Sequence, residues 1–128
     1  MFRVYYRRRR VRRRASKASV ARYEQHKEAA RALVHEKLAR LAPVFGVSYK
    51  KVFIKNSRSR WGSCSERRNL NFNYRLALLP DELADYVVAH ELCHLIHFNH
   101  SPAFWAEVAR ACPEWKRLRR ELKKIRLS

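Results

Sequence analysis

Two histidines four residues apart flank a glutamate in the run His90-Glu91-Leu92-Cys93-His94. Residues four apart on an α-helix are offset by only about 40° around its axis, so both imidazole rings would lie on one side, a turn apart. Glu91 would lie one step round, close enough to take a proton from a metal-bound water without being a ligand itself. The spacing therefore predicts a metal site with His90 and His94 as ligands and Glu91 as general base.

A tetrahedral zinc ion held by two imidazoles and a water lacks one ligand, and four later residues are candidates. His97 lies one turn beyond His94, where a straight helix would rotate it away from the metal. His100 follows the expected helix end, where the chain can turn back, whereas Glu107 and Glu114 lie at the distance where some zinc peptidases place a glutamate ligand. We expect His100 to complete the site and one Zn²⁺ to be bound per chain.

The segment that carries these residues is mostly apolar from Leu83 to Phe98, and it is expected to form one helix that begins near Pro80. A helix that is apolar almost all round must lie in the core. A buried carboxylate without a partner is costly, so Glu91 needs a cation or a proton nearby. A bound metal would meet that need.

The flanking sequence predicts an α+β domain. Apolar residues recur at three- and four-residue steps from Ser19 to about Ala42, which indicates a helix ended by Pro43 and Gly46. Strands are expected over residues 51–55, 60–64 and 70–76, forming a small antiparallel sheet. After the histidine-bearing helix, two C-terminal helices are expected, starting near Ser101 and Glu114.

The composition fits one globular domain with a strong positive charge. The chain has 128 residues, 47% of them hydrophobic, and 30 Lys and Arg oppose 11 Asp and Glu, which gives a net charge of +19. Such a surplus attracts polyanions. We divide the chain into a basic arm, residues 1–17, and a catalytic domain, residues 18–128. We expect DNA or RNA to bind the basic C-terminal helix and this arm, through Arg7, Arg8, Arg9, Arg10, Arg12, Arg13 and Arg14. The alternative for the arm is a solvated tail or a short strand with a polar face of arginines.

The three cysteines are odd in number and far apart, so no disulfide framework is expected. No apolar stretch is long enough to span a bilayer, and the arginine-rich start lacks the apolar centre of a secretory signal. We expect a reducing, cytoplasmic location, and the positive charge fits a position near nucleic acid. The sequence does not indicate an oligomeric state.

Four stretches of the sequence closely resemble the YgjP-like metal-dependent hydrolase family, bacterial zincins with a metallopeptidase-type domain. They read SRWGSCS (59–65), NLNFNYRL (69–76), YVVAHELCH (86–94) and NHSPAFW (99–105). The resemblance runs from about Tyr23 to Leu122. It implies a zincin-like single domain in which His90, His94 and His100 bind the metal and Glu91 is the base.

The segment that begins at His100 is also similar to the third-ligand segment of SprT and Spartan proteases, which cut proteins crosslinked to DNA. One departure from the YgjP-like pattern is large. Members of that family carry a β-rich region before the first helix, and here the arginine-rich residues 1–17 stand in its place.

The strand around Arg60-Trp61-Gly62-Ser63 is expected to border the cleft. In zincins a substrate peptide commonly pairs with such an edge strand, and Gly62 would let the two backbones approach closely. The alternative for Trp61 is packing against the histidine-bearing helix. Residues that could stabilise the oxyanion of the reaction are Arg60, Tyr74 and Arg75.

We therefore predict a zinc-dependent metallopeptidase that acts on protein or peptide substrates. Three rivals stay open: a nucleotide pyrophosphatase or other phosphohydrolase, a nucleic-acid-binding module with a structural zinc, and a latent or inactive zincin. The absence of a glycine-rich phosphate loop and the scarcity of carboxylates for Mg²⁺ count against the first rival. The second would need a fourth protein ligand, and no cysteine or further histidine is well placed to supply it.

Overall fold

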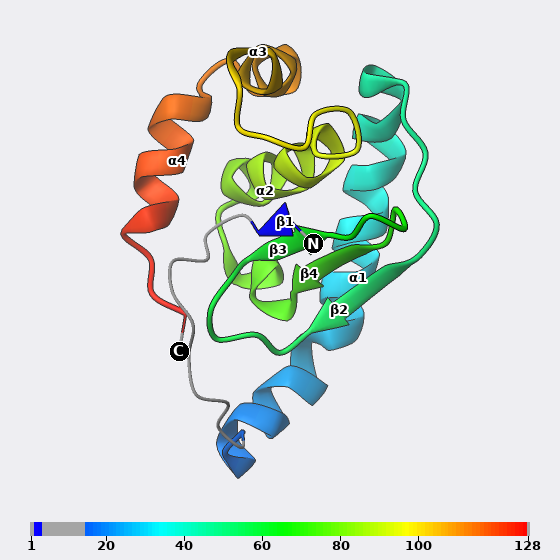
Figure 1. Ribbon diagram of the computed structural model, residues 1–128. Coiled ribbons are helices and arrows are strands. Elements are labelled where there is room, and N and C mark those ends of the chain that lie inside the picture. Colours follow the sequence, from blue (N-terminus) through cyan, green and yellow to red (C-terminus); the bar gives the residue numbers. More distant parts are fainter. Residues whose placement is uncertain (1, 4–14, 128) are drawn as a thin grey trace.

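The computed structural model describes residues 2–3 and 15–127 (Figure 1). Residues 4–14, which hold the arginines predicted to bind nucleic acid, lie outside the described residues. The elements follow in the order β1 (Phe2–Arg3), α1 (Lys17–Phe45), β2 (Val52–Lys55), β3 (Gly62–Cys64), β4 (Leu70–Asn73), the 3-10 helix η1 (Tyr74–Leu78), α2 (Asp81–Cys93), α3 (Pro102–Ala111) and α4 (Trp115–Lys123). The predicted α+β class is confirmed.

The four strands form one sheet in the order β1-β3-β4-β2. We predicted an antiparallel sheet, but the observed sheet is mixed. β3 pairs antiparallel with both β1 and β4, but β2 runs parallel to β4, with Ile54 beside Phe72. The chain leaves β2, passes to the far side of β4 and returns through the β3–β4 hairpin. An alternating pattern identifies a strand but not the direction of its neighbour, so the sequence could not distinguish these arrangements.

The predicted edge position of β3 is also corrected by this order. The outer neighbour of β3 is β1, with Phe2 opposite Cys64 and Arg3 opposite Ser63. A substrate strand therefore cannot pair with that edge of β3 while β1 is in place.

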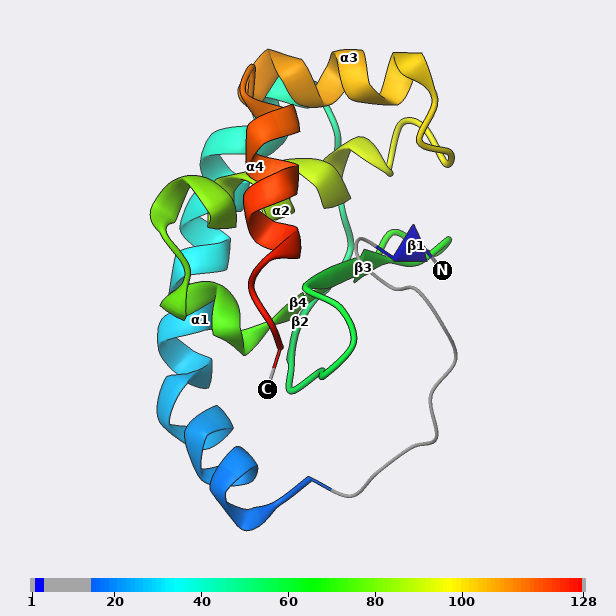
Figure 2. The ribbon, with the colours of Figure 1, turned by 90° about the vertical axis from the view of Figure 1, so that its left-hand side faces the viewer.

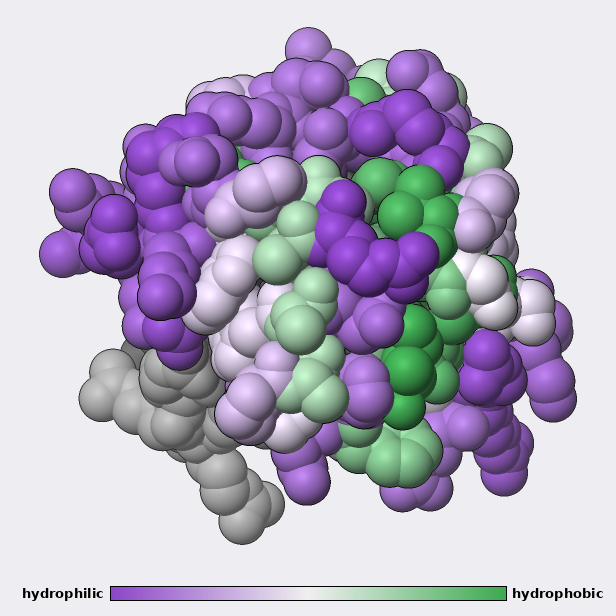
Figure 3. Space-filling model, turned by 90° about the horizontal axis from the view of Figure 1, so that it is seen from above, coloured by the Kyte–Doolittle hydropathy of each residue, from purple (hydrophilic) through white to green (hydrophobic). Residues whose placement is uncertain are grey.

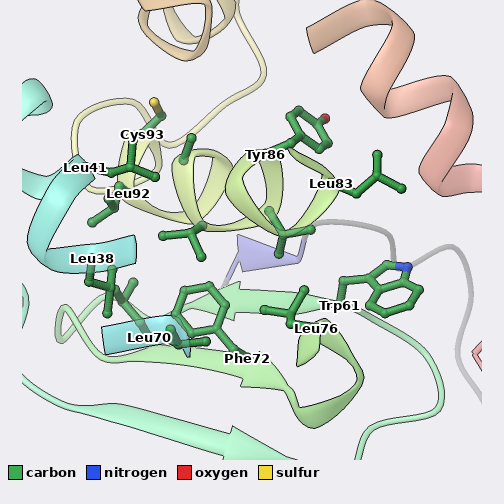
Figure 4. Packing of buried hydrophobic residues seen from close by; sticks show 14 of the residues in the cluster. Leu38, Leu41, Trp61, Leu70, Phe72, Leu76, Leu83, Tyr86, Leu92 and Cys93 are labelled. Carbon is green, nitrogen blue, oxygen red and sulfur yellow. The ribbon is translucent and has the colours of Figure 1, made fainter. Parts of the chain in front are cut away.

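One face of the sheet is covered by α1 and α2, while α3 and α4 lie farther out (Figures 1 and 2). Leu70 and Phe72 point from β4 toward the helices, where they meet Leu38 of α1 and Leu92 of α2 (Figure 4). All four side chains are fully buried. Because burial of such side chains is the main stabilising term in folding, this core determines where α2 lies.

A buried lysine connects α1 to the start of α2. Lys37 Nζ lies 2.7 Å from a carboxylate oxygen of Asp81 and 2.6 Å from one of Asp85, and Arg40 also bonds to Asp85 at 2.6 Å. Burial alone would lower the pKa of Lys37, but the hydrogen bonds with Asp81 and Asp85 raise it, so the ammonium stays charged. The pairs fix the first turn of α2 against α1.

Three element boundaries differ from the predictions. α1 continues through Pro43 to Phe45 before Gly46, at φ +65°, ends it. β4 stops at Asn73, whose side-chain oxygen accepts a hydrogen bond from the Arg75 backbone N–H and starts η1. α2 ends at Cys93 instead of Phe98, so the residues after His94 form a loop.

All three cysteines, Cys64, Cys93 and Cys112, are free and buried, as expected from their odd number and wide spacing. In the described part of the chain, no helix has the length and apolarity that a membrane span requires.

Candidate metal centre

The last turn of α2 carries three polar side chains into the core. His90, Glu91 and His94 have exposed fractions of 1%, 0% and 2%. The sheet, α1, α3 and α4 all pack around α2, so these residues are enclosed on every side except toward the loop that follows. Polar groups in such a place need partners, and a metal ion held by the two histidines would supply one.

The Nε2 atoms of three histidines converge to a triangle. His90 and His94 are 3.2 Å apart at these atoms, His94 and His100 3.0 Å, and His100 and His90 3.2 Å. Tetrahedral bonds of about 2.0–2.1 Å from one zinc ion would place its ligand nitrogens about 3.3 Å apart. The triangle fits one ion of that size.

The loop after α2 brings His100 back over the helix end and also orients His94. α2 ends at Cys93, five residues before the predicted end at Phe98, so the chain turns directly after the helix. His94 Nδ1 lies 3.1 Å from the carbonyl oxygen of His97. A carbonyl only accepts, so Nδ1 must donate, and the lone pair of His94 is then on Nε2, toward the triangle.

Two aromatic residues of α3 support the imidazoles. The Phe104 ring stacks on His94 with centroids 4.5 Å apart, and the Trp105 ring lies 5.5 Å from His100 and 5.7 Å from His90. Ser101 starts α3 by accepting a hydrogen bond from the Phe104 backbone N–H. The short connection from His100 to this helix thus positions both the third histidine and the wall beside it.

Burial keeps His90 and His94 neutral. It lowers the pKa of His94 to about 4, although the hydrogen bond to the His97 carbonyl opposes the shift. Burial and the neighbouring histidines lower the pKa of His90 well below its ordinary value of 6.5. Neutral imidazole is the form that binds a metal, so protons compete weakly for the site at neutral pH.

Glu91 directly follows His90 in α2 and is fully buried, and neither of its carboxylate oxygens has a hydrogen-bond partner among the described residues. Burial raises its pKa well above the ordinary value, and the positive charge of Arg60 acts in the opposite direction. An orphaned buried carboxylate next to three convergent nitrogens matches the environment of a general base at a metal site.

Gly62 of β3 makes room for this carboxylate. A Cβ atom at residue 62 would lie 3.2 Å from Glu91 Cγ and 3.1 Å from the backbone oxygen of Asn71. We expected the glycine to admit a substrate backbone, but in the structure it is Glu91 itself that occupies the nearby space.

The residues predicted to contact substrate are divided between two locations. Arg60, Gly62 and Ser63 line a pocket of about 290 Å³ together with residues from the end of β2 and from β4. A side chain at residue 62 would point toward Glu91. Because side chains alternate along a strand, the side chain of Ser63 points to the other face of the sheet. Trp61, only 4% exposed, is part of the core, the alternative considered for it.

Tyr74 and Arg75 contact the first helix and the polar loop after β2. Tyr74 packs against Tyr23 and His26, while the Arg75 guanidinium lies over the Tyr74 ring, 4.5 Å from its centroid. Arg75 also donates to the side-chain oxygens of Asn56 and Asn73 and to the backbone oxygen of Ser57. These contacts order the loop that leads to β3.

The other ligand candidates have different partners. Glu107 forms an ion pair with Arg110 at 2.9 Å, and Glu114 with Arg117 at 3.6 Å. Within residues 15–127 and β1, the cluster of His90, His94 and His100 is the sole group of three or more potential ligands with converging atoms.

Sequence reasoning missed one feature of this site, the pair Trp105 and Arg119. Arg119, on α4, has its guanidinium carbon 5.5 Å from the centroid of the Trp105 ring, and its charge helps to lower the pKa of His90. The two residues are far apart in the chain. Only the i, i+4 spacing of Trp115 and Arg119 indicated that a cation lies beside a tryptophan on this helix.

Comparison with known proteins agrees with this geometry. The model of the YgjP-like family, described as a metallopeptidase domain, matches residues 3–125. The metallopeptidase zymogen abylysin of Pyrococcus abyssi has a similar fold, with a TM-score of 0.64 and 24% identity over 72% of this chain and 94% of that one. Jannalysin of Methanocaldococcus jannaschii, also a metallopeptidase zymogen, gives a TM-score of 0.56 and 21% identity over 74% and 94%. No curated protein matches the chain.

Proposed function

The chain belongs to the family of YgjP-like metallopeptidase domains, and from this we propose that it hydrolyses peptide bonds with a zinc ion held by His90, His94 and His100 and with Glu91 as general base. The observation that carries the proposal is the buried carboxylate of Glu91. It has no partner among the described residues, and it directly follows the first of three histidines whose Nε2 atoms converge.

The choice of zinc rests on the donor set. Three imidazoles in a triangle of about this size suit a tetrahedral ion and leave one position open. When bound, zinc would lower the pKa of a water molecule toward neutrality and polarise the scissile carbonyl.

Glu91 is suited to handle the proton in this reaction. Its carboxyl has a raised pKa, which makes the carboxylate a stronger base than an exposed glutamate. It would take the proton from the attacking water and then deliver it to the leaving amine. Burial excludes bulk water that would otherwise compete for that proton.

The rival with a structural zinc is disfavoured by two observations. The cluster offers three ligands where a closed structural site has four, and His100 is exposed, so the remaining position opens outward. Glu91 would also have no role in a structural site. Nucleotide hydrolysis is disfavoured because the family model that matches the chain describes a metallopeptidase domain.

We also propose that the domain works close to nucleic acid, on the basis of its net charge of +19. The described part of the chain contributes a basic α4, whose exposed residues include Lys116, Arg120, Lys123 and Lys124. A sequence-independent attraction to phosphates would keep the enzyme near proteins that are bound to the same polymer.

The test is hydrolysis of a mixed protein substrate, with and without DNA, by zinc-loaded wild type and Glu91→Gln. We expect cleavage by the wild type that a chelator abolishes, and a loss of about 10²–10⁴-fold in Glu91→Gln, the usual contribution of a general base. Equal turnover of the two zinc-loaded proteins would overturn the assignment of Glu91. If neither the wild type nor the variant cleaves any protein, the peptidase proposal fails.

A further inference from the structure

Arg119 lies at the rim of the metal centre without an acidic partner. Its guanidinium carbon is 5.5 Å from the centroid of the Trp105 ring. Among the described residues, no carboxylate lies within ion-pair distance of it, although Arg117, two residues earlier, pairs with Glu82, Glu114 and Glu121. Arg119 is half-buried, so water does not fully compensate for the missing partner.

Trp105 connects Arg119 to the metal centre. The same indole ring that lies beneath the guanidinium is 5.5 Å from the His100 ring and 5.7 Å from the His90 ring. Trp105 also stacks on Trp115, with centroids 4.2 Å apart and planes inclined by 14°. Because both tryptophans are fixed in this stack, the position of the Arg119 guanidinium is restricted as well.

Several positive charges lie around Arg119, so an anion would be a favourable ligand there. Its neighbours along α4 are Lys116 and Arg120, and the site one ring away is built to hold a divalent cation. Seen from the side of α3, hydrophilic residues surround the hydrophobic ones of this face (Figure 3). A planar guanidinium held on an aromatic face presents its N–H groups edge-on, which is the geometry that binds a carboxylate through two hydrogen bonds.

We propose that Arg119, held on Trp105, forms a carboxylate-binding subsite beside the metal centre and selects peptides that present a carboxylate near the scissile bond. This inference rests on the peptidase function proposed above. The carboxylate can belong to an Asp or Glu side chain or to the C-terminus of the peptide. The two sources share one chemistry, and the experiment separates them.

The activity test uses zinc-loaded full-length protein and three peptides. The first has a Glu side chain near the cleavage site and an amidated C-terminus, the second has Gln in place of Glu and the same amide, and the third has Gln and a free C-terminus. Arg119→Gln should reduce kcat/KM for the peptide with the preferred carboxylate by roughly 10–100-fold, as expected for a lost hydrogen bond to a charged group, and change the uncharged peptide little. Arg119→Lys keeps the charge but not the planar group, so its kcat/KM for that peptide should lie between the values of the wild type and Arg119→Gln.

Arg120→Gln is the matched control in these assays, which contain no nucleic acid, because it removes the same charge from the next residue of α4, whose side chain is exposed. Preference for the first peptide over the second assigns the subsite to side chains, and preference for the third over the second assigns it to the C-terminus. The proposal is overturned if Arg119→Gln lowers kcat/KM equally for all three peptides, if Arg120→Gln has the same effect, or if the wild type shows no preference.

Binding of the same peptides to Glu91→Gln, measured by calorimetry, does not depend on turnover. The variant should bind the preferred carboxylate peptide at least about 10-fold more tightly than the uncharged one, and adding Arg119→Gln should remove the difference. If the wild type cleaves nothing but this binding difference is present, the peptidase proposal fails and the subsite stands. If peptides are cleaved but bind equally with and without Arg119, the subsite fails alone.

Discussion

Gly62 and Glu91 are packed so closely that the glycine has no room for a side chain: a Cβ atom there would lie 3.2 Å from Glu91 Cγ and 3.3 Å from its Oε2. The same Cβ atom would lie 3.1 Å from the backbone oxygen of Asn71. The position of the proposed base therefore depends on a residue of the adjacent strand that has no side chain.

Gly62→Ala should separate catalysis from metal binding. The added methyl group must displace the Glu91 side chain, and a misplacement near 1 Å reduces rates by about 10²-fold. Peptidase activity should fall by roughly that factor while the zinc content, measured by atomic absorption, stays close to one per chain.

The other glycine of the chain provides the control. Gly46 ends α1 at φ +65°, and a Cβ there would meet nothing within 4 Å. Gly46→Ala should lower the free energy of unfolding by about 1–2 kcal/mol, because an L residue is strained in the left-handed region, yet leave activity per folded molecule intact. If Gly46→Ala loses as much activity as Gly62→Ala, general destabilisation explains both.

His97 should contribute to the metal site through its backbone and not through its ring. Its carbonyl oxygen holds His94 Nδ1 at 3.1 Å, and His97→Ala keeps that carbonyl. We expect zinc affinity to change by less than about 10-fold in His97→Ala, but to fall by more than about 100-fold in His94→Ala and His100→Ala, which each lose a ligand.

Competition with a chromophoric chelator measures these affinities. The exposed His35 supplies a further control, since His35→Ala removes a histidine from a different part of the fold. Zinc retention by His100→Ala together with its loss from His97→Ala would reverse the assignment of the third ligand.

Replacement of the buried Glu91 carboxyl group by an amide should stabilise the metal-free protein above pH 4.5 relative to the wild type. Burial raises the pKa of this carboxyl in the folded state, so above the ordinary value of 4.5 the unfolded chain has released a proton that the folded chain still holds. The free energy of unfolding contributed by Glu91 therefore falls as pH rises through this range, and Glu91→Gln abolishes that fall.

Urea unfolding of both proteins in the presence of a chelator tests the sign. The difference in stability between Glu91→Gln and wild type should increase from pH 4.5 to 7 by about 1.4 kcal/mol for each pKa unit by which the carboxyl is shifted. The lowered pKa of His94 is common to both proteins, so it cancels in the comparison. A difference that is constant or shrinks over this range contradicts the raised pKa.

Binding to nucleic acid should depend steeply on salt and weakly on base sequence. If six or more phosphates are contacted, affinity should drop by roughly 10³-fold or more between about 50 and 200 mM salt, because bound counterions are released. Removal of residues 1–14 should reduce the slope, and so should neutralisation of Lys116, Arg120, Lys123 and Lys124. Fluorescence anisotropy with single- and double-stranded oligonucleotides measures the affinity and its dependence on salt. The absence of binding at 50 mM salt would rule out nucleic acid as a partner.

The features of the fold that were predictable depend on local periodicity. The helical and strand segments, the burial of α2 and the convergence of His90 with His94 all follow from residues a few positions apart. The pairing of β2 with β4 and the position of β1 beside β3 depend on contacts between distant segments, which a strand pattern does not encode. The early end of α2 is another such case, because the apolar residues from Leu95 to Phe98 continue the pattern although the chain has already turned.

The same distinction between local spacing and long-range contacts applies to the site. The histidines lie close together in the sequence, so their spacing carried the information. The space that Gly62 leaves for Glu91 and the contact of Arg119 with Trp105 exist only after the sheet and α4 have packed on α2.

The three histidines come from one short segment, residues 90–100, whereas the groups that act on Glu91 come from β3, about thirty residues earlier in the chain. The metal site and the position of the base therefore depend on different segments of the chain. A disturbance confined to the start of β3 would displace the Glu91 carboxylate while the helix end and its loop still hold the ion. Inactivation would then precede demetallation, and a protein that retains its full complement of zinc would not necessarily be an active one.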